Sequence, residues 1–255
     1  MDLITNLRLV EFDLSSACTR KCPFCSPGIP KHRRENPVYL HPGIIFATCM
    51  ELVINDFKGC IALCGHGEPT MHPDLIKISV EIKRILPRNS LVLFTNGDLL
   101  TVNLLNELMV DKIIFDCYDF PTGKKVKETV LKSNKVDKVF CIDHARGVRK
   151  FNSRAGAVYA SVCNNKPCDF MARKVFLTAE GDWITCCNDY KQTNKWRGTL
   201  KTMFNNQKHI FMRNHLMIPN REVLDPCKYC DVGTVGQNHC IMDEPSILDC
   251  DWDKK

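Results

Sequence analysis

The chain has 255 residues, a net charge of +6 and 44% hydrophobic residues, enough for a full core in one large domain or one domain plus a small one. Its 16 cysteines are many for this length and occur in close groups. A disulfide framework suits a short secreted chain, and residues 1–16 lack the apolar stretch of a signal peptide. No run is long enough for a membrane span. We expect a cytoplasmic protein.

Basic residues form three groups, at Lys31–Arg34, Lys124–Lys125 and Arg146–Lys150. Such runs are usually solvated faces, and we expect that here. The first run follows a cysteine-rich loop, so a contact with an anionic substrate is the alternative. Nucleic-acid binding is not expected, because no aromatic platform is interleaved with the charges.

Predicted strands and helices alternate in the first half of the chain. Strands are predicted at 7–14, 60–64, 90–94, 112–115 and 138–142, and helices at 42–55, 73–86, 101–110 and 124–132. Short links between them predict parallel βαβ units. About 150 residues suit a partial barrel, since a complete one takes about 250. The polar motifs follow strand ends, which form the catalytic face of such barrels.

The pattern changes after Gly156. A hairpin is predicted from 174–178 and 183–186 around Glu180-Gly181-Asp182, then a helix at 199–211 and an irregular tail with cysteines. We therefore predict two domains, 1–156 and 157–255. The fold class is α/β, with a small C-terminal α+β domain.

Three cysteines lie within eight residues after the first strand, with Cys-x3-Cys-x2-Cys spacing: Cys18, Cys22 and Cys25. A structural zinc site needs four ligands. Three thiolates on a 4Fe–4S cluster leave one iron without a protein ligand, and that iron can bind a small molecule.

This spacing, with Phe24 before the last cysteine, resembles the signature of radical S-adenosylmethionine (SAM) enzymes. The resemblance implies a partial (β/α)6 TIM-like barrel, a catalytic 4Fe–4S cluster and bound SAM. In that family the open iron binds SAM, and one electron then yields a 5′-deoxyadenosyl radical that abstracts hydrogen from the substrate. It also implies an electron donor such as flavodoxin or ferredoxin.

Three further motifs follow later strands. His66-Gly67-Glu68-Pro69 resembles a family turn that holds the amino group of SAM, with His66 in place of a glycine. Thr95-Asn96-Gly97 resembles a turn near SAM. Arg154, in Ser153-Arg154, has a planar fork suited to a carboxylate, and a related arginine contacts SAM or substrate. We expect a catalytic role for Arg154, the alternative being a surface arginine at a hinge. The expected SAM-site residues are Phe24, His66, Gly67, Glu68, Thr95, Asn96, Ser153 and Arg154.

A second cysteine set, Cys168-x12-Gly181-x4-Cys186 and Cys227-x2-Cys230, resembles the SPASM/Twitch extension, which binds auxiliary clusters. The resemblance implies that Cys168, Cys186, Cys227 and Cys230 hold a second 4Fe–4S cluster. A structural zinc site is the alternative, and Cys187 could replace Cys186 as ligand. A further auxiliary cluster is doubtful because position 236 is Gly, although Cys163, Cys240 and Cys250 are spare.

The expected function is therefore that of a radical SAM oxidoreductase. The best hypothesis is oxidation of a secondary alcohol in a sugar- or cyclitol-like small molecule. Peptide modification is the main alternative, disfavoured because the first strand begins near Leu7 and leaves no room for a preceding peptide-recognition domain. A zinc-stabilised, non-enzymatic interaction protein is the alternative from another class.

Overall fold

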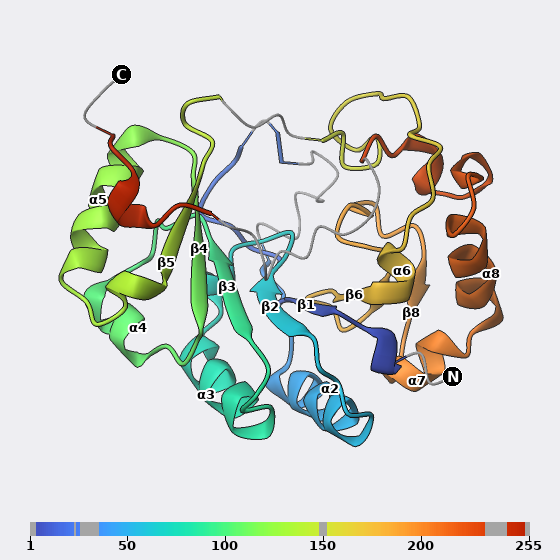
Figure 1. Ribbon diagram of the computed structural model, residues 1–255, viewed down its shortest axis with the longest axis horizontal. Helices are drawn as coiled ribbons and strands as arrows, with labels where there is room; N and C mark the ends of the chain where they lie inside the picture. The colour runs from blue at the N-terminus through green and yellow to red at the C-terminus, as the bar shows by residue number, and fades with distance from the viewer. Residues whose placement is uncertain (1–3, 23, 26–35, 148–151, 233–243, 253–255) are drawn as a thin grey trace.

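The computed structural model describes residues 4–22, 24–25, 36–147, 152–232 and 244–252, and its centre is one eight-stranded sheet (Figure 1). The strand order is β5-β4-β3-β2-β1-β6-β7-β8. Strands β1 to β6 pair in parallel, whereas β7 and β8 pair antiparallel. The strands are β1 (Leu9–Asp13), β2 (Cys60–Cys64), β3 (Leu91–Thr95), β4 (Lys112–Cys117), β5 (Val139–Asp143), β6 (Lys174–Leu177), β7 (Trp183–Ile184) and β8 (Lys195–Trp196).

Helices connect the parallel strands, as βαβ units require. The helices are α2 (Pro42–Ile54), α3 (Leu75–Ile85), α4 (Val102–Glu107), α5 (Phe120–Leu131), α6 (Phe170–Arg173), α7 (Leu200–Phe204) and α8 (Gln207–Leu216). Figure 1 shows α2 to α5 around the outside of strands β1 to β5, with α7 and α8 at the opposite end of the sheet. This arrangement confirms the predicted α/β class.

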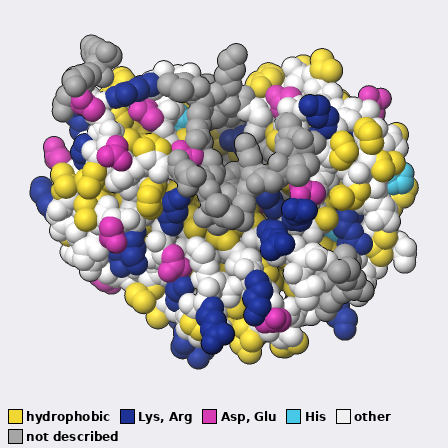
Figure 2. Space-filling view, viewed as in Figure 1, with side chains coloured by type: hydrophobic (Ala, Val, Ile, Leu, Met, Phe, Trp, Pro, Cys, Tyr) yellow, Lys and Arg dark blue, Asp and Glu magenta, His cyan; other side chains and the backbone are white. Residues whose placement is uncertain are grey.

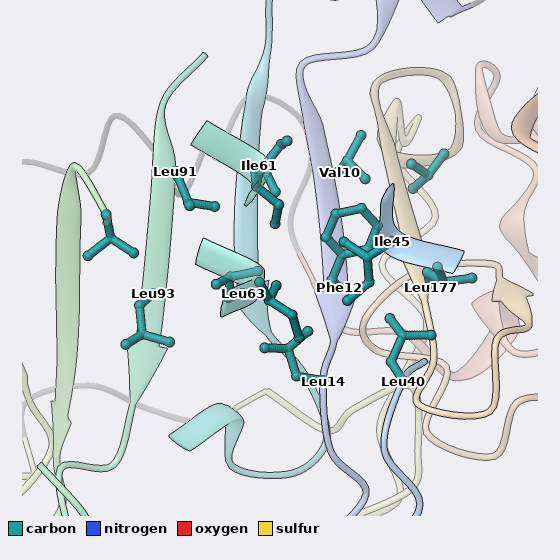
Figure 3. Close-up of a cluster of buried hydrophobic side chains, with 14 of the residues drawn as sticks. Val10, Phe12, Leu14, Leu40, Ile45, Ile61, Leu63, Leu91, Leu93 and Leu177 are labelled. Atoms are coloured by element: carbon teal, nitrogen blue, oxygen red, sulfur yellow. The ribbon is translucent and has the colours of Figure 1, made fainter. Parts of the chain in front are cut away.

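Each parallel strand has two different faces because successive side chains point to opposite sides of a sheet. On β1, Val10 and Phe12 point to the helix side, where they pack with Ile45 of α2 in the main core (Figure 3). Leu9 points to the inner side and packs with Ala62, Val92, Ile114 and their neighbours in a smaller buried cluster. Alternation therefore also directs Glu11, two residues after Leu9, to the inner side.

Two predicted helix boundaries were wrong, and side-chain caps explain both. The helix predicted at 124–132 begins at Phe120, because the Asp119 carboxylate accepts a hydrogen bond from the Thr122 backbone and Pro121 fits the first turn. The helix predicted at 199–211 is two helices. The first helix ends at Phe204 with Asn205 as its C-cap, and Asn206 caps the start of α8, accepting hydrogen bonds from the backbone of Lys208 and His209.

The sheet is continuous across the predicted domain boundary near residue 157. Five parallel strands precede that residue, and the sixth, β6, comes after it and pairs with β1, with Leu9 opposite Lys174. The hairpin formed by β6 and β7 confirms the one predicted around Gly181. Strand β1 thus pairs with β2 from the first predicted domain and with β6 from the second.

Basic side chains are scattered over the visible face and mixed with acidic ones (Figure 2). This distribution agrees with the expectation that the basic groups lie on solvated faces. The basic run at 31–34 and residues 148–150 lie outside the described residues, so their predicted roles stay predictions. Across the described ranges, no helix is long and apolar enough to cross a membrane.

Candidate active site

A cavity of about 750 Å³ lies at the carboxyl ends of strands β1 to β5. The thiols of Cys18, Cys22 and Cys25 all line it. The other expected SAM-site residues that line it are Phe24, His66, Gly67, Glu68, Thr95, Asn96 and Arg154, and Ser153 is not among the lining residues. The loops after parallel strands thus bring together most of the residues that the motifs singled out.

The cluster loop is fixed by Arg20, which lies between the first two cysteines. Its guanidinium donates to both Asp98 carboxylate oxygens, with Nε at 2.9 and 3.0 Å, and to Asp119 at 2.7 Å. It also donates to the Thr122 hydroxyl at 2.8 Å. Its partners follow β3 and β4, so this one side chain joins the loops after three strands.

Removing the Arg20 guanidinium should weaken binding of the first cluster, since residues that orient metal ligands typically contribute about 10–100-fold to affinity or activity. We expect Arg20→Met to reduce both SAM cleavage and retention of the first cluster's iron under chelator. Arg84→Gln, which breaks an exposed ion pair with Glu81 on α3, is the control and should change neither. If Arg20→Met retained as much iron as the unsubstituted protein, the hydrogen bonds of Arg20 would not support cluster binding.

The Glu68 carboxylate joins the turns after β2 and β3. Its Oε1 accepts hydrogen bonds from the Thr70 backbone and hydroxyl and from the Thr95 hydroxyl, the last at 2.7 Å. Its Oε2 accepts from the Asn96 backbone at 2.9 Å. Burial raises the pKa of Glu68, and the hydrogen bonds from Asn96, Thr70 and Thr95 oppose that rise. Oε2 keeps acceptor capacity, so a contact with the SAM amino group stays a prediction.

The glycine of this motif allows a close approach of two loops. A Cβ on Gly67 would lie 1.9 Å from the carbonyl oxygen of Ser15, so no side chain fits. The neighbouring His66 ring packs between Phe176 and Tyr190, with centroids at 4.9 and 4.1 Å. Its Nε2 lies 3.0 Å from the carbonyl oxygen of Cys187. His66 therefore links the turn after β2 to the chain beyond β7.

Aromatic rings line the other side of the cavity. Phe24 of the cluster loop packs on Tyr118, with centroids 5.0 Å apart, and Tyr118 stacks on His144 at 5.1 Å. His144 Nε2 lies 3.1 Å from an Asp116 carboxylate oxygen. This chain of contacts connects the cluster loop to the ends of β4 and β5. Asn96 adds a polar contact, donating from Nδ2 to Thr19 at 3.0 Å and to Cys18 Sγ at 3.5 Å.

Arg154 places a guanidinium in the cavity with few partners of its own. The residue is in the left-handed region at φ 51°, uncommon for a residue other than glycine. Its Nη1 donates a long hydrogen bond of 3.4 Å to Asn188, and its buried Nε has no hydrogen-bond partner in the part of the chain that the structure describes. The adjacent Ser153 is buried and donates instead to Asp231, next to Cys230, at 2.8 Å. Arg154 is thus available to a bound anion or hydroxyl.

The second cysteine set lines a separate, smaller cavity of about 30 Å³. All four predicted ligands are there: Cys168, Cys186, Cys227 and Cys230. Burial raises the pKa of Cys227 to about 12, and nearby thiolates at Cys168 and Cys230 add to the rise. The four thiols thus line one cavity, as a shared iron–sulfur cluster would require.

The paired cysteines Cys186 and Cys187 face different cavities. Cys186 lines the small one and Cys187 lines the large one. This geometry favours Cys186 as the auxiliary ligand, as the spacing predicted. Two consecutive residues thus line the two cavities.

The iron content tests that choice. Two 4Fe–4S clusters imply about eight irons per reconstituted chain, and we expect Cys186→Ala to lower this to about four. Cys187→Ala is the matched control and should keep about eight. If iron instead fell in Cys187→Ala and not in Cys186→Ala, Cys187 would be the ligand. Stoichiometric zinc together with a single cluster would favour a structural zinc site.

The spare cysteines have other surroundings. Cys163 Sγ lies 3.4 Å from the carbonyl oxygen of Cys227, and it does not line the small cavity. Cys250 interacts with Cys141 of β5, and Figure 1 shows its segment beside α5, away from α8. Cys240 lies outside the described residues.

Sequence reasoning missed two cavity carboxylates, Glu11 on β1 and Asp116 on β4. Glu11 Oε1 lies 3.9 Å from Cys64 Sγ. Burial raises the pKa of Glu11 to about 7, whereas the charge of Lys174 and a hydrogen bond with Cys187 act to lower it. The available signal was a charged residue at an inward, alternate position near the end of an apolar strand.

The thiols of the cluster loop have the chemistry that a 4Fe–4S cluster requires. Burial raises the pKa of Cys22 to about 11, and the nearby Cys25 and Cys18 thiolates add to the rise. Three thiols crowded on one loop, with a polar donor from Asn96 beside Cys18, fit a cluster that neutralises them. Within the described residues, no three His, Cys, Asp or Glu side chains converge on a single metal ion.

Comparison with known proteins agrees with this site. Residues 13–116 of this chain match the model of the radical SAM superfamily. It is 24% identical over 236 residues to the S-adenosyl-L-methionine-dependent 2-deoxy-scyllo-inosamine dehydrogenase of Niallia circulans, covering 88% of this chain and 92% of the relative.

Two solved structures share the fold. The crystal structure of BtrN in complex with AdoMet and 2-DOIA matches with a TM-score of 0.72 and 24% identity, covering 89% of this chain and 93% of BtrN. BtrN in an open conformation matches with a TM-score of 0.65 and 23% identity, covering 89% of this chain and 92% of that one. The match to the superfamily model indicates a radical SAM enzyme, with a 4Fe–4S cluster and SAM as its implied cofactors.

Proposed function

We propose that this enzyme oxidises a secondary alcohol of a small, polar, sugar- or cyclitol-like molecule to a ketone. The observation that carries the proposal is the adjacency of two thiol sites. The large cavity holds the three-cysteine loop, Arg154 and Glu11, and the Cys186–Cys187 pair connects it to the four-cysteine cavity. Hydrogen abstraction and electron removal need neighbouring centres of this kind.

The cofactors supply the difficult chemistry and the protein positions them. When bound, the first cluster with SAM supplies a 5′-deoxyadenosyl radical, and an auxiliary cluster supplies an acceptor for the second electron. The substrate carbinol carbon would give a hydrogen atom to the 5′-deoxyadenosyl radical, which becomes 5′-deoxyadenosine. The hydroxyl would then lose a proton and the carbon an electron, which leaves the ketone. An external donor such as flavodoxin or ferredoxin supplies the initiating electron.

The chain's own groups have separate tasks in this proposal. Arg154 binds a substrate oxygen through its unused Nε and orients the carbinol. Glu11 accepts the hydroxyl proton, because a general base works best with a pKa near the operating pH. Residues 157–255 form the auxiliary domain, and its closed four-thiolate cluster leaves no iron open to substrate.

The relatives support the substrate class. The Niallia circulans enzyme is by name a dehydrogenase of 2-deoxy-scyllo-inosamine, and the BtrN crystal contained 2-DOIA. The two inward carboxylates, Glu11 and Asp116, suit a substrate that carries hydroxyl or amino groups.

The proposal is tested with an amino- or phosphate-bearing cyclitol deuterated at the carbinol carbon. Deuterium should appear in 5′-deoxyadenosine, and the product should be two hydrogens lighter than the unlabelled parent. A product with a new carbon–carbon or carbon–sulfur bond would overturn the dehydrogenase proposal. Modification of a peptide substrate would instead support the alternative function, peptide modification by a radical SAM enzyme.

Inversion of the carbinol centre is a second candidate, favoured by the thiols of Cys64 and Cys187 beside Glu11 in the cavity. A thiol can return a hydrogen atom to a carbon radical; the resulting thiyl radical would then need one electron from the external donor and a proton. The same experiment in deuterated water separates the two reactions, because only inversion puts solvent deuterium on that carbon.

The raised pKa of Glu11 predicts a pH dependence. Glu11 must be ionised to accept a proton, and its ionised fraction grows as pH rises through about 7. We expect substrate oxidation to increase between about pH 6 and pH 8, and Glu11→Gln to be slower by about 10²–10⁴-fold and to lack this rise. Lys174, Cys64 and Cys187 face Glu11 and remain in the variant. An unchanged profile in Glu11→Gln would assign the base elsewhere.

A further inference from the structure

The small four-cysteine cavity contains an arginine that is almost completely buried. Arg221 is 1% exposed and begins the 3₁₀ turn η4 (Arg221–Val223). It lines the cavity with Cys168, Cys186, Cys227 and Cys230. Burying a charge is costly unless it is paired, so such a residue calls for an explanation.

The partners of Arg221 do not neutralise its charge. Its Nη1 donates to the carbonyl oxygen of Val232, and its Nη2 to that of Pro167, both at 3.0 Å. Within the described residues, its buried Nε has no hydrogen-bond partner, and no ion pair includes Arg221. Among the described residues that line the cavity with it, the only groups that can carry a negative charge are the cysteine thiols.

The electrostatic effect of Arg221 falls on those thiols. Arg221 lines the same cavity of about 30 Å³ as all four cysteines, so its guanidinium charge acts on their sulfurs at close range. The guanidinium therefore favours the anionic form of the predicted ligands. A four-thiolate cluster is an anionic group, and it becomes more negative when it accepts an electron.

We propose that Arg221 is the built-in counter-charge of the auxiliary cluster and raises its reduction potential, so that the cluster accepts an electron from the substrate. The inference rests on the proposed function, which assigns a 4Fe–4S cluster to this cavity. The physical reason is that a fixed positive charge in a low-dielectric interior stabilises the reduced, more negative state more than the oxidised state. Net charge and hydrogen bonding are among the factors that set cluster potentials.

The alternative is a purely structural role. The two carbonyl contacts connect Pro167, which precedes Cys168, with Val232, which follows Cys230 by two residues. Arg221 could therefore hold the cysteine-bearing segments in place without affecting electron transfer. Two variants separate charge from shape: Arg221→Gln removes the charge and keeps a donor, whereas Arg221→Lys keeps the charge and loses the planar fork.

The test is a redox titration of the auxiliary cluster, followed by electron paramagnetic resonance, in the full-length reconstituted chain without substrate. A Cys22→Ala background isolates its signal. We expect Arg221→Gln to shift the midpoint potential downward with iron retained, and Arg221→Lys to stay near the unsubstituted value. Arg197→Gln, which removes an exposed arginine paired with Asp182, is the control and should shift nothing.

Two results would overturn the inference: an unchanged potential in Arg221→Gln, or equal shifts in the Gln and Lys variants. If Arg221→Gln loses the cluster, the iron content of Arg221→Lys distinguishes a role of the charge from a structural role. Retention of iron by the Lys variant supports the charge, and loss from both variants makes the role structural. A protein with Arg221 intact but no second iron–sulfur cluster would instead contradict the proposed function.

Discussion

Cys22→Ala should abolish reductive cleavage of SAM while leaving the auxiliary cluster in place. The three cluster-loop thiols line one cavity, and three thiolates are the complete protein ligand set of a cluster with one open iron. Loss of a ligand should exceed the effect of about 10–100-fold that is typical for residues supporting one. Formation of 5′-deoxyadenosine under dithionite measures the activity, and iron should fall from about eight to about four per chain.

Cys49→Ala is the matched control for this experiment. Cys49 is buried in α2, on the helix side of the sheet, and does not line the cavity. Its substitution should leave both the iron content and SAM cleavage near those of the unsubstituted protein. Continued 5′-deoxyadenosine formation by Cys22→Ala would contradict the ligand assignment.

Arg154→Met should greatly reduce substrate oxidation and leave SAM cleavage without substrate within about twofold, as expected for an interaction made with substrate alone. Removing one partner of a buried, charged hydrogen bond costs about 2–5 kcal/mol, which corresponds to roughly 30-fold to several thousand-fold. Of the two arginines that line the cavity among the described residues, Arg20 is held by Asp98 and Asp119, whereas Arg154 has one long hydrogen bond.

Arg154→Lys is the comparison that isolates the side chain. A lysine at this position carries the same left-handed backbone cost as arginine, at φ 51°, but offers a point charge in place of a fork. We expect an intermediate loss of substrate oxidation. Equal losses of SAM cleavage and substrate oxidation in Arg154→Met would show that Arg154 serves SAM and not the substrate.

Local sequence patterns predicted most of the fold. The apolar runs of β1 to β5 and the helical spacing of α3 depend on neighbouring residues, which the sequence displays directly. Helix boundaries were less certain because caps decide them: Asp119 starts α5 early, and Asn206 divides one predicted helix into two. Those caps are short-range features, so the sequence near each boundary contains the information that sets it.

The sequence also indicated most of the candidate site, because its motifs are local. Three cysteines within eight residues must lie close together in any fold, and loops after parallel strands meet at one edge of a sheet. The Cys186–Cys187 choice followed from spacing as a prediction, and the two cavities now favour the same residue.

Other parts of the site depend on contacts between residues far apart in the chain. Arg20 bonds to Asp98 and Asp119, which lie 78 and 99 residues away, so its partners follow from the strand order β1-β2-β3-β4 and not from its neighbours.

The sequence by itself determined the thiol spacing, the alternating α/β pattern and the family to which they point. Only the tertiary structure decided which charges are buried. Glu11 faces the cavity because β1 lies between β2 and β6, and the second of these pairings comes from a strand more than 160 residues later. Arg221 faces the cysteines because the segments around Cys168 and Cys230 converge on it. Burial is set by the whole chain, and it is burial that turns these ordinary side chains into a base and a counter-charge.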